Sequence, residues 1–170
     1  MYSWQGDPNL SGTSDRDYLH QVVLHLTDEI SRSESPANEY FLRGNAYLDA
    51  GQFAEASRDY SSAIELDPTN SVYFNNLGLA LRYMEQFDAA IEAYDKAIEL
   101  DPGYRDAFTN RGVVLADRGD LNLAVENFGR AIDIDPDFWF AISQRGLTLW
   151  ALGRRAEAEA DYTRVRQLRS

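Results

Sequence analysis

Apolar and polar residues follow one another along this chain at the spacing of α-helices, and the pattern returns at a fixed interval. The stretch Ala-Ile-Glu-Leu-Asp-Pro at residues 63–68 recurs at 97–102 and, as Ala-Ile-Asp-Ile-Asp-Pro, at 131–136. The three prolines lie 34 residues apart, with no insertion or deletion between them. A fixed period of this length is typical of repeat architectures. No stretch shows the alternation of a strand, so the pattern predicts helices alone.

The period divides residues 37–170 into four units, each expected to hold two helices. Gly51, Gly119 and Gly153 lie where the first helix of a unit must stop, because a glycine adopts the left-handed conformation at little cost. A proline near the end of the unit cannot continue the second helix. The four units are 37–70, 71–104, 105–138 and 139–170.

Ahead of the repeats, a separate apolar stripe predicts one more helix over residues 14–34. Its apolar residues recur at helical spacing, with Ser14 as the expected N-cap. We expect this helix to cover the N-terminal end of the array, and residues 1–13 to form a flexible arm. The stripe consists of Leu19, Val22, Val23, Leu26 and Ile30.

Small and aromatic residues hold fixed positions within the unit. Small residues let two helices approach closely, while aromatic rings fill the space between them. The glycines are Gly44, Gly78, Gly112 and Gly146; the alanines are Ala56, Ala90, Ala124 and Ala158, then Ala63, Ala97 and Ala131, with Val165 in the last unit; the aromatic residues are Tyr60, Tyr94, Phe128 and Tyr162.

In its period and in these positions the chain resembles the tetratricopeptide repeat family, over about four-fifths of its length. The resemblance implies an all-α fold, a right-handed α-solenoid of helix–turn–helix repeats with the N-terminal helix as a cap. It also implies a binding surface for another protein.

A second pattern pairs two positions inside each unit. Arginine stands at 43, 111 and 145, with Asp59, Asn127 and Asp161 sixteen residues later. In the remaining unit Leu77 is matched by Ala93. We therefore expect each arginine to bond to the acceptor in its own unit, because a partly buried guanidinium requires one. This favours a structural role for the arginines over a ligand-binding one.

Composition narrows the class of protein. A hydrophobic fraction of 44% argues against a disordered chain despite the net charge of −12, and that acidic balance disfavours nucleic acid as a partner. No apolar run is long enough for a membrane span, and the N-terminal residues have no signal-peptide pattern. We therefore expect a cytoplasmic protein without membrane insertion.

The C-terminal end is the basic part of the chain. Arg166 stands where the other units have isoleucine, and a terminal repeat needs a polar outer face. We expect Arg166, with Arg164 and Arg169, to form a cap, and Ser170 to be a natural end.

Residues for catalysis or metal binding are scarce. There is no cysteine, and His20 and His25 are five residues apart, so they do not share a helix face as a zinc pair would. Residues 133–144 open like a calcium loop, but Phe138 and Gln144 replace its glycine and its final glutamate. We expect no enzyme activity, no cofactor and no metal site.

The remaining candidate is a peptide-binding surface. In the resembled family the first helices of successive repeats line the concave wall, and an apolar stripe broken by amides suits a bound peptide. By this resemblance the whole wall also includes Leu42, Leu48, Val72, Asn75, Arg82, Thr109 and Asp117. The predicted peptide-binding residues are Phe41, Asn45, Asn76, Leu79, Tyr83, Asn110, Val113, Phe140, Gln144, Leu147 and Trp150.

Asn76, Asn110 and Gln144 occupy one position of consecutive units. They resemble the asparagine ladder in the repeats of protein O-glycosyltransferases, without a transferase domain. The carboxylate clamp of chaperone-binding members is only half present, because Phe41, Asp106 and Asn110 stand where its cations belong.

These observations favour a non-catalytic scaffold or adaptor that holds a segment of a partner protein in the concave groove. Two alternatives stay open. One is a chaperone of the type III secretion class, which has a similar size and an N-terminal helix. The other is a structural protein that self-associates through Trp139, Phe140 and Trp150 or through the helix at 14–34.

Overall fold

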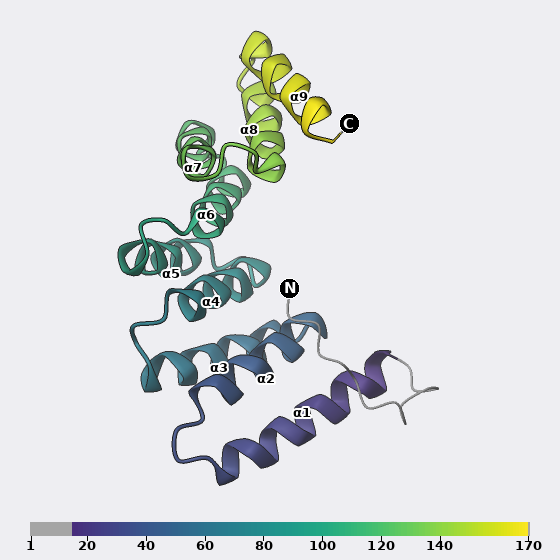
Figure 1. Cartoon of the computed structure of the whole chain (residues 1–170), viewed down its shortest axis with the longest axis vertical. Helices are drawn as coiled ribbons and strands as arrows, with labels where there is room; N and C mark the ends of the chain where they lie inside the picture. Colours follow the sequence, from purple (N-terminus) through teal and green to yellow (C-terminus); the bar gives the residue numbers. More distant parts are fainter. Residues whose placement is uncertain (1–14, 170) are drawn as a thin grey trace. The chain divides into compact units, whose positions relative to one another are not determined.

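The computed structural model describes residues 15–169, and in that part of the chain helices joined by short turns make up the fold, without a strand (Figure 1). The all-α class predicted from the sequence is confirmed. The predicted arm at 1–13 and the predicted cap Ser14 lie outside the described residues. In chain order the helices are α1 (Asp15–Arg32), α2 (Ala37–Asp49), α3 (Phe53–Leu66), α4 (Ser71–Tyr83), α5 (Phe87–Leu100), α6 (Arg105–Arg118), α7 (Leu121–Ile134), α8 (Trp139–Ala151) and α9 (Arg155–Leu168).

The turn inside each helix pair depends on one residue in the left-handed conformation. Gly51, Gly119 and Gly153 have φ angles of 73°, 93° and 76°, as predicted. In the remaining pair Glu85 occupies the matching position with a φ of 57°. A side chain in this conformation is strained because its Cβ crowds the backbone, so the turn between α4 and α5 is the strained member of the set.

Inside each pair, a glycine of the first helix makes room for an aromatic ring of the second. A Cβ added to Gly44, Gly78 or Gly112 would lie 2.7 Å from a ring carbon of the aromatic residue sixteen positions later. From the sequence we expected these glycines to let the two helix backbones approach each other. In the structure the aromatic ring lies in the space that each glycine leaves open. The alanines predicted to be core residues are buried beside it.

The predicted arginine pairs are confirmed. Arg43 donates from Nε and Nη2 to the two carboxylate oxygens of Asp59, each at 2.7 Å. Arg145 makes the same two bonds to Asp161, at 2.8 and 2.6 Å, and Arg111 Nε donates to Asn127 Oδ1 at 2.8 Å. Such two-pronged bonds fix the two helices of a pair against each other.

The described chain forms two compact units, which are joined between Asp67 and Pro68. The first contains the pair α2–α3, with α1 packed on α2. In it, Arg43 Nη1 also donates to Thr27 Oγ1 of α1 at 2.9 Å. Arg111 makes the matching bond to Asp95 of α5, and Thr27 and Asp95 are two periods of 34 residues apart.

The frame of the repeats thus extends back into α1. Leu26, Tyr60, Tyr94 and Phe128 lie 34 residues apart, and all four are buried. Helix α1 therefore contacts α2 as the second helix of one repeat contacts the first helix of the next.

The second unit is a stack of three pairs, α4–α5, α6–α7 and α8–α9. Each second helix packs on the following first helix, α5 on α6 and α7 on α8. Ile98 and Ile132, which the repeat places at the same position, pack in one cluster with Phe108, Ala141 and Ile142. At that position α9 carries Arg166, which is exposed.

Candidate functional site

The first helices of the second unit form a continuous surface. Helix α4 contacts α6, and α6 contacts α8, so equivalent residues of the three helices recur across the unit. We call the predicted peptide-binding residues on these helices the first-helix surface. They are Asn76, Leu79 and Tyr83 of α4, Asn110 and Val113 of α6, and Phe140, Gln144, Leu147 and Trp150 of α8.

Apolar side chains of this surface are open to solvent to an extent that core packing does not explain. Leu147 is 54% exposed and Trp150 49% exposed, and Tyr83 is exposed as well. Leu79 and Val113 are half-buried at the position that Leu147 occupies in α8. Exposed apolar groups gathered on one surface are typical of binding sites.

Two amides of the first-helix surface, Asn76 and Asn110, are joined in a hydrogen-bonded network through the buried Asn75. Asn110 Nδ2 donates to Asn75 Oδ1 at 3.0 Å, and Asn75 Nδ2 donates to Asn76 Oδ1 at 3.0 Å. The network links α6 to α4 and fixes the orientation of the side chains. Within it Asn110 acts as a donor, which leaves its Oδ1 as an acceptor for an N–H group.

Two residues that the family resemblance placed on the binding wall are buried instead. Asn75 is only 6% exposed and Thr109 only 1% exposed, so neither offers an open surface. Both occupy the position that faces the neighbouring first helix. Asn75 bonds across that contact, and Thr109 Oγ1 donates to the carbonyl oxygen of Arg105 in its own helix.

An ion pair that sequence reasoning missed crosses the same surface. Arg82 Nε donates to Asp117 Oδ2 at 2.8 Å, from the end of α4 to the end of α6. The Arg82 guanidinium also lies over the ring of Tyr83, 5.7 Å from its centre. Both charged residues had been assigned to the wall, but their contact depends on helix packing that no single repeat reveals.

The predicted residues of the first unit, Phe41 and Asn45, lie on α2 and contribute to its packing. Tyr60 donates its hydroxyl to Asn45 Oδ1 at 2.8 Å, and the rings of Phe41 and Tyr60 are 6.0 Å apart. Asn45 therefore serves as an acceptor for a core tyrosine in addition to its predicted place in a binding surface.

Tyr94, the counterpart of Tyr60, has no such acceptor. Its hydroxyl is buried and has no hydrogen-bond partner among the described residues, since Leu79 replaces Asn45 at the matching position. Burial raises the pKa of the Tyr94 hydroxyl above its ordinary value. Burial also raises the pKa of Tyr104 to about 12, with smaller effects from Asp106 and Asp101.

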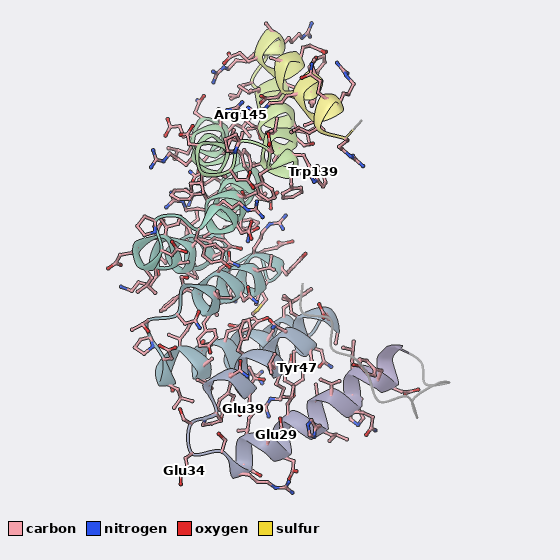
Figure 2. The ribbon with its side chains drawn as sticks, in the orientation of Figure 1. Glu29, Glu34, Glu39, Tyr47, Trp139 and Arg145 are labelled. Atoms are coloured by element: carbon pink, nitrogen blue, oxygen red, sulfur yellow. The ribbon has the colours of Figure 1, made fainter. Side chains whose placement is uncertain are left out.

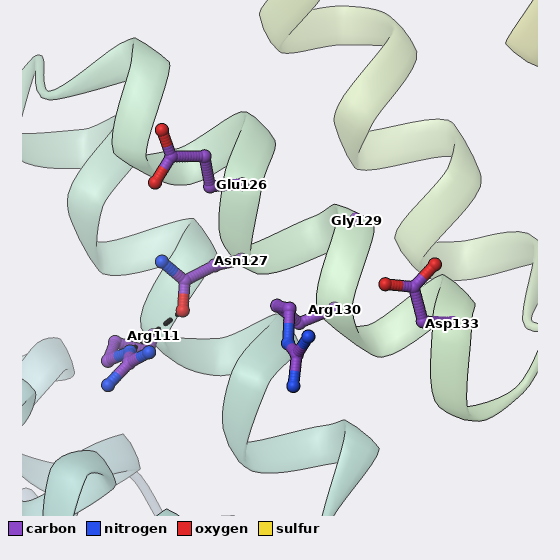
Figure 3. Close-up of a pocket in the computed structure, with 6 residues that line it drawn as sticks. All are labelled: Arg111, Glu126, Asn127, Gly129, Arg130 and Asp133. Carbon is purple, nitrogen blue, oxygen red and sulfur yellow. Dashed lines mark hydrogen bonds between the residues drawn. The ribbon is translucent and has the colours of Figure 1, made fainter.

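Two pockets of the second unit lie at the arginine pairs. One of about 350 Å³ is lined by Arg111, Glu126, Asn127, Gly129, Arg130 and Asp133 (Figure 3). Another, of about 320 Å³, includes Arg145 and Asp161. Neither contains a predicted peptide-binding residue, and their arginines hold the helix pairs together.

Two properties of the described residues bear on other functions. No group of three or more histidine and acidic side chains is arranged to hold a metal ion. None of the helices there is both long and apolar enough to cross a bilayer.

Paired helices that stack with a constant period define the class of helical repeat proteins. Tetratricopeptide repeat models match residues 71–104 and 106–138, and a TPR repeat model matches residues 44–82. Together they cover more than half of the chain, which belongs to the tetratricopeptide repeat family.

Solved structures agree with this fold. A crystal structure of MamA is 24% identical, with a TM-score of 0.83, and the match covers 99% of this chain and 96% of that one. YrrB, described as a TPR protein with an unusual peptide-binding site, is 24% identical with a TM-score of 0.72 over 89% of this chain and 78% of YrrB. The first TPR of Spaghetti, bound to an HSP90 peptide, is 25% identical with a TM-score of 0.66 over 69% of this chain and 93% of that one.

Proposed function

We propose that this chain is a protein-interaction scaffold whose first-helix surface holds a segment of a partner protein, without chemistry of its own. The proposal rests on one observation, which is that α4, α6 and α8 carry the same types of residue at equivalent positions. An amide recurs at Asn76, Asn110 and Gln144, and an apolar residue recurs at Leu79, Val113 and Leu147. Amides bond to a peptide backbone and apolar patches take its side chains.

Two features support a peptide as the occupant. The hydrogen-bond network holds Asn76 and Asn110 in fixed orientations, so little conformational entropy is lost when they bind. Exposed Leu147 and Trp150 provide apolar area next to them, and tryptophan is enriched among residues that dominate binding energy. The peptide bound to Spaghetti is a precedent on a related fold.

The proposal is tested by selecting peptides that bind the purified chain and measuring their affinity for a triple variant, Asn76→Ala/Asn110→Ala/Trp150→Ala. We expect at least a tenfold loss, because each side chain contributes about 1 kcal/mol or more. The matched control is Arg58→Ala/Glu92→Ala/Glu126→Ala, which changes exposed residues of α3, α5 and α7. Equal affinity for the triple variant and the wild type would refute the proposal.

Self-association is the competing use of the same residues. Trp139 and Trp150 are about half exposed, and Trp139 contacts Phe140 edge to face with ring centres 5.9 Å apart. Light scattering over a range of concentrations separates the two functions. A monomer at high micromolar concentration excludes self-association, whereas a dimer lost in Trp139→Ala/Trp150→Ala would favour it over peptide binding.

A further inference from the structure

Among the side chains that the structure describes, most cations without an acidic partner lie at the C-terminal end of the chain. Most arginines of the described residues form ion pairs, among them Arg82, Arg118 and Arg154. Those without a described carboxylate at ion-pairing distance are Arg130, Arg155, Arg164, Arg166 and Arg169, and all but Arg130 belong to α9 or its C-cap. A chain with 28 acidic residues and 16 basic ones could have paired them. The polar outer face of a terminal repeat accounts for Arg164 and Arg166, but Arg155 and Arg169 also lie over tryptophan rings.

Arg155 departs both from the repeat and from the charge preference of a helix end. The matching residues of the other pairs are apolar, namely Phe53, Phe87 and Leu121. Arg155 is also the first residue of α9, where the positive end of the helix dipole disfavours a cation. Its guanidinium lies over the ring of Trp150, 5.4 Å from the ring centre. The matching Phe87 packs against a cluster that includes Val114 of the following repeat. No repeat follows α9 among the described residues, so Arg155 has no such partner and contacts Trp150 instead.

A second pair of the same kind lies at the other end of α8. The guanidinium of Arg169 lies over the ring of Trp139, 5.1 Å from its centre, and Trp139 is the first residue of α8 (Figure 2). Trp139 is 45% exposed. Because the two helices of a pair run antiparallel, the start of α9 meets the end of α8, and the end of α9 meets its start.

The two tryptophans share one face of α8. They are eleven residues apart, which is about three turns and about 17 Å along the helix. Leu147, the most exposed large apolar residue among those described, lies between them. We call Trp139, Leu147, Trp150, Arg155 and Arg169 the Trp–Arg surface. It is an apolar strip with a cation at each end.

We propose that this surface selects the peptide, taking segments that combine acidic residues with aliphatic or aromatic ones. The inference rests on the peptide-binding function proposed above. Carboxylates bond to Arg155 and Arg169, and an apolar side chain between them packs on Leu147 and the indole rings.

A guanidinium stacked on an indole keeps its N–H edge available for a carboxylate, which it binds in two-pronged geometry. The separation of the tryptophans corresponds to about five residues of extended chain. A terminal carboxylate is not required, since the acids are internal side chains.

The test is a selection of random twelve-residue peptides displayed with fixed flanking sequences at both ends, so that no terminal carboxylate contributes. Wild-type chain should enrich two acids about five residues apart, with an apolar residue between them. The charge-reversed variant Arg155→Glu/Arg169→Glu should enrich lysine and arginine at those positions. The control Arg130→Glu/Arg166→Glu has the same change in net charge, leaves both tryptophan contacts in place, and should keep the acidic preference.

For one enriched peptide, Arg155→Ala or Arg169→Ala should each weaken binding about tenfold, the loss of one charge-assisted hydrogen bond. If the enriched peptides contain no acidic residues, or if charge reversal does not change the preference, the inference is wrong. Either result leaves the proposed function intact. If no peptide is enriched on any variant, the proposed function fails as well.

Discussion

At the scale of single residues, the repeats serve as internal controls for one another. Tyr60, Tyr94 and Phe128 occupy the same position, are all buried, and differ only in the hydroxyl group and its acceptor. Tyr60 has Asn45 as its acceptor, Tyr94 has no partner, and Phe128 needs none. A buried polar group without a partner costs about 1–3 kcal/mol.

We therefore predict opposite effects for the same substitution in two repeats. Tyr94→Phe should raise the free energy of unfolding by about 1 kcal/mol, because it removes an unsatisfied hydroxyl. Tyr60→Phe should lower it by about 1 kcal/mol, because Asn45 loses its donor. Urea denaturation of the two variants measures both values. If Tyr94→Phe lowered the free energy of unfolding, the hydroxyl of Tyr94 would not be unsatisfied.

The same tyrosine gives the stability a pH dependence. Burial raises the pKa of Tyr94, so above about pH 10 the unfolded chain loses this proton before the folded chain does. The folded state then binds more protons, and its stability falls as pH rises. The advantage of Tyr94→Phe over wild type should therefore grow above pH 10 and stay constant between pH 7 and 9.

The turn at Glu85 provides another residue-scale prediction. Glu85→Gly should raise the free energy of unfolding by about 1 kcal/mol, because glycine adopts a positive φ without strain. The reverse change, Gly51→Ala, should lower it by about 1 kcal/mol, since nothing lies near that glycine except its own backbone. Thermal denaturation of both variants measures these two changes in stability. A less stable Glu85→Gly would show that the glutamate side chain stabilises the turn.

At the scale of helix pairs, the arginine bonds explain a pattern visible in the sequence. Arg43 and Asp59 are largely buried, and removing one member leaves an uncompensated charge. Arg43→Leu should therefore lower the free energy of unfolding by about 3 kcal/mol. Arg43→Leu/Asp59→Ala should recover most of this loss, because it copies the natural pair Leu77 and Ala93.

The measurement is a double-mutant cycle in urea. Asp59→Ala is the second single variant, and the exposed pair Arg58 and Glu55 is the control, for which a coupling below about 1 kcal/mol is expected. Simple additivity at Arg43 and Asp59 would contradict the account.

Contacts within a pair could be predicted from the sequence, whereas contacts between successive first helices could not. Arg43 and Asp59 vary together at fixed positions of the unit, so comparing units reveals them. The bonds from Asn110 to Asn75 and from Arg82 to Asp117 join residues 35 apart, one more than the period. They link different positions of adjacent units, and among the described residues each bond is found at a single pair of helices, so no repetition marks them.

The sequence did contain a signal that α1 follows the repeat pattern. Leu26 and Ile30 lie one period before Tyr60 and Ile64, but no glycine or proline of the repeat accompanies them. The helix was predicted, while its equivalence to a second repeat helix became clear only from the bond between Arg43 and Thr27.

At the scale of the whole molecule, the described chain divides into two compact units although its 34-residue period is uninterrupted. The sequence passes Asp67 and Pro68 without an insertion, yet the chain forms two compact units on either side. Phe138, just before α8, and Ala141, in its first turn, join an apolar cluster with Ile132. The matching residues before and in α4 are Asn70, whose side chain caps that helix by accepting from Val72 N–H, and Tyr73. The residue types at these two positions therefore differ between the start of α4 and the start of α8.

Peptide binding to the first-helix surface can be tested most directly on the whole molecule. With a selected peptide at saturation, backbone NMR shifts of the intact chain should change along α4, α6 and α8, most strongly near Asn110, Leu147 and Trp150. The outer face, including the exposed residues of α5 and α7, should be little affected. Shift changes centred on the pocket at Arg111 and Arg130, with the first-helix surface unchanged, would contradict the central claim.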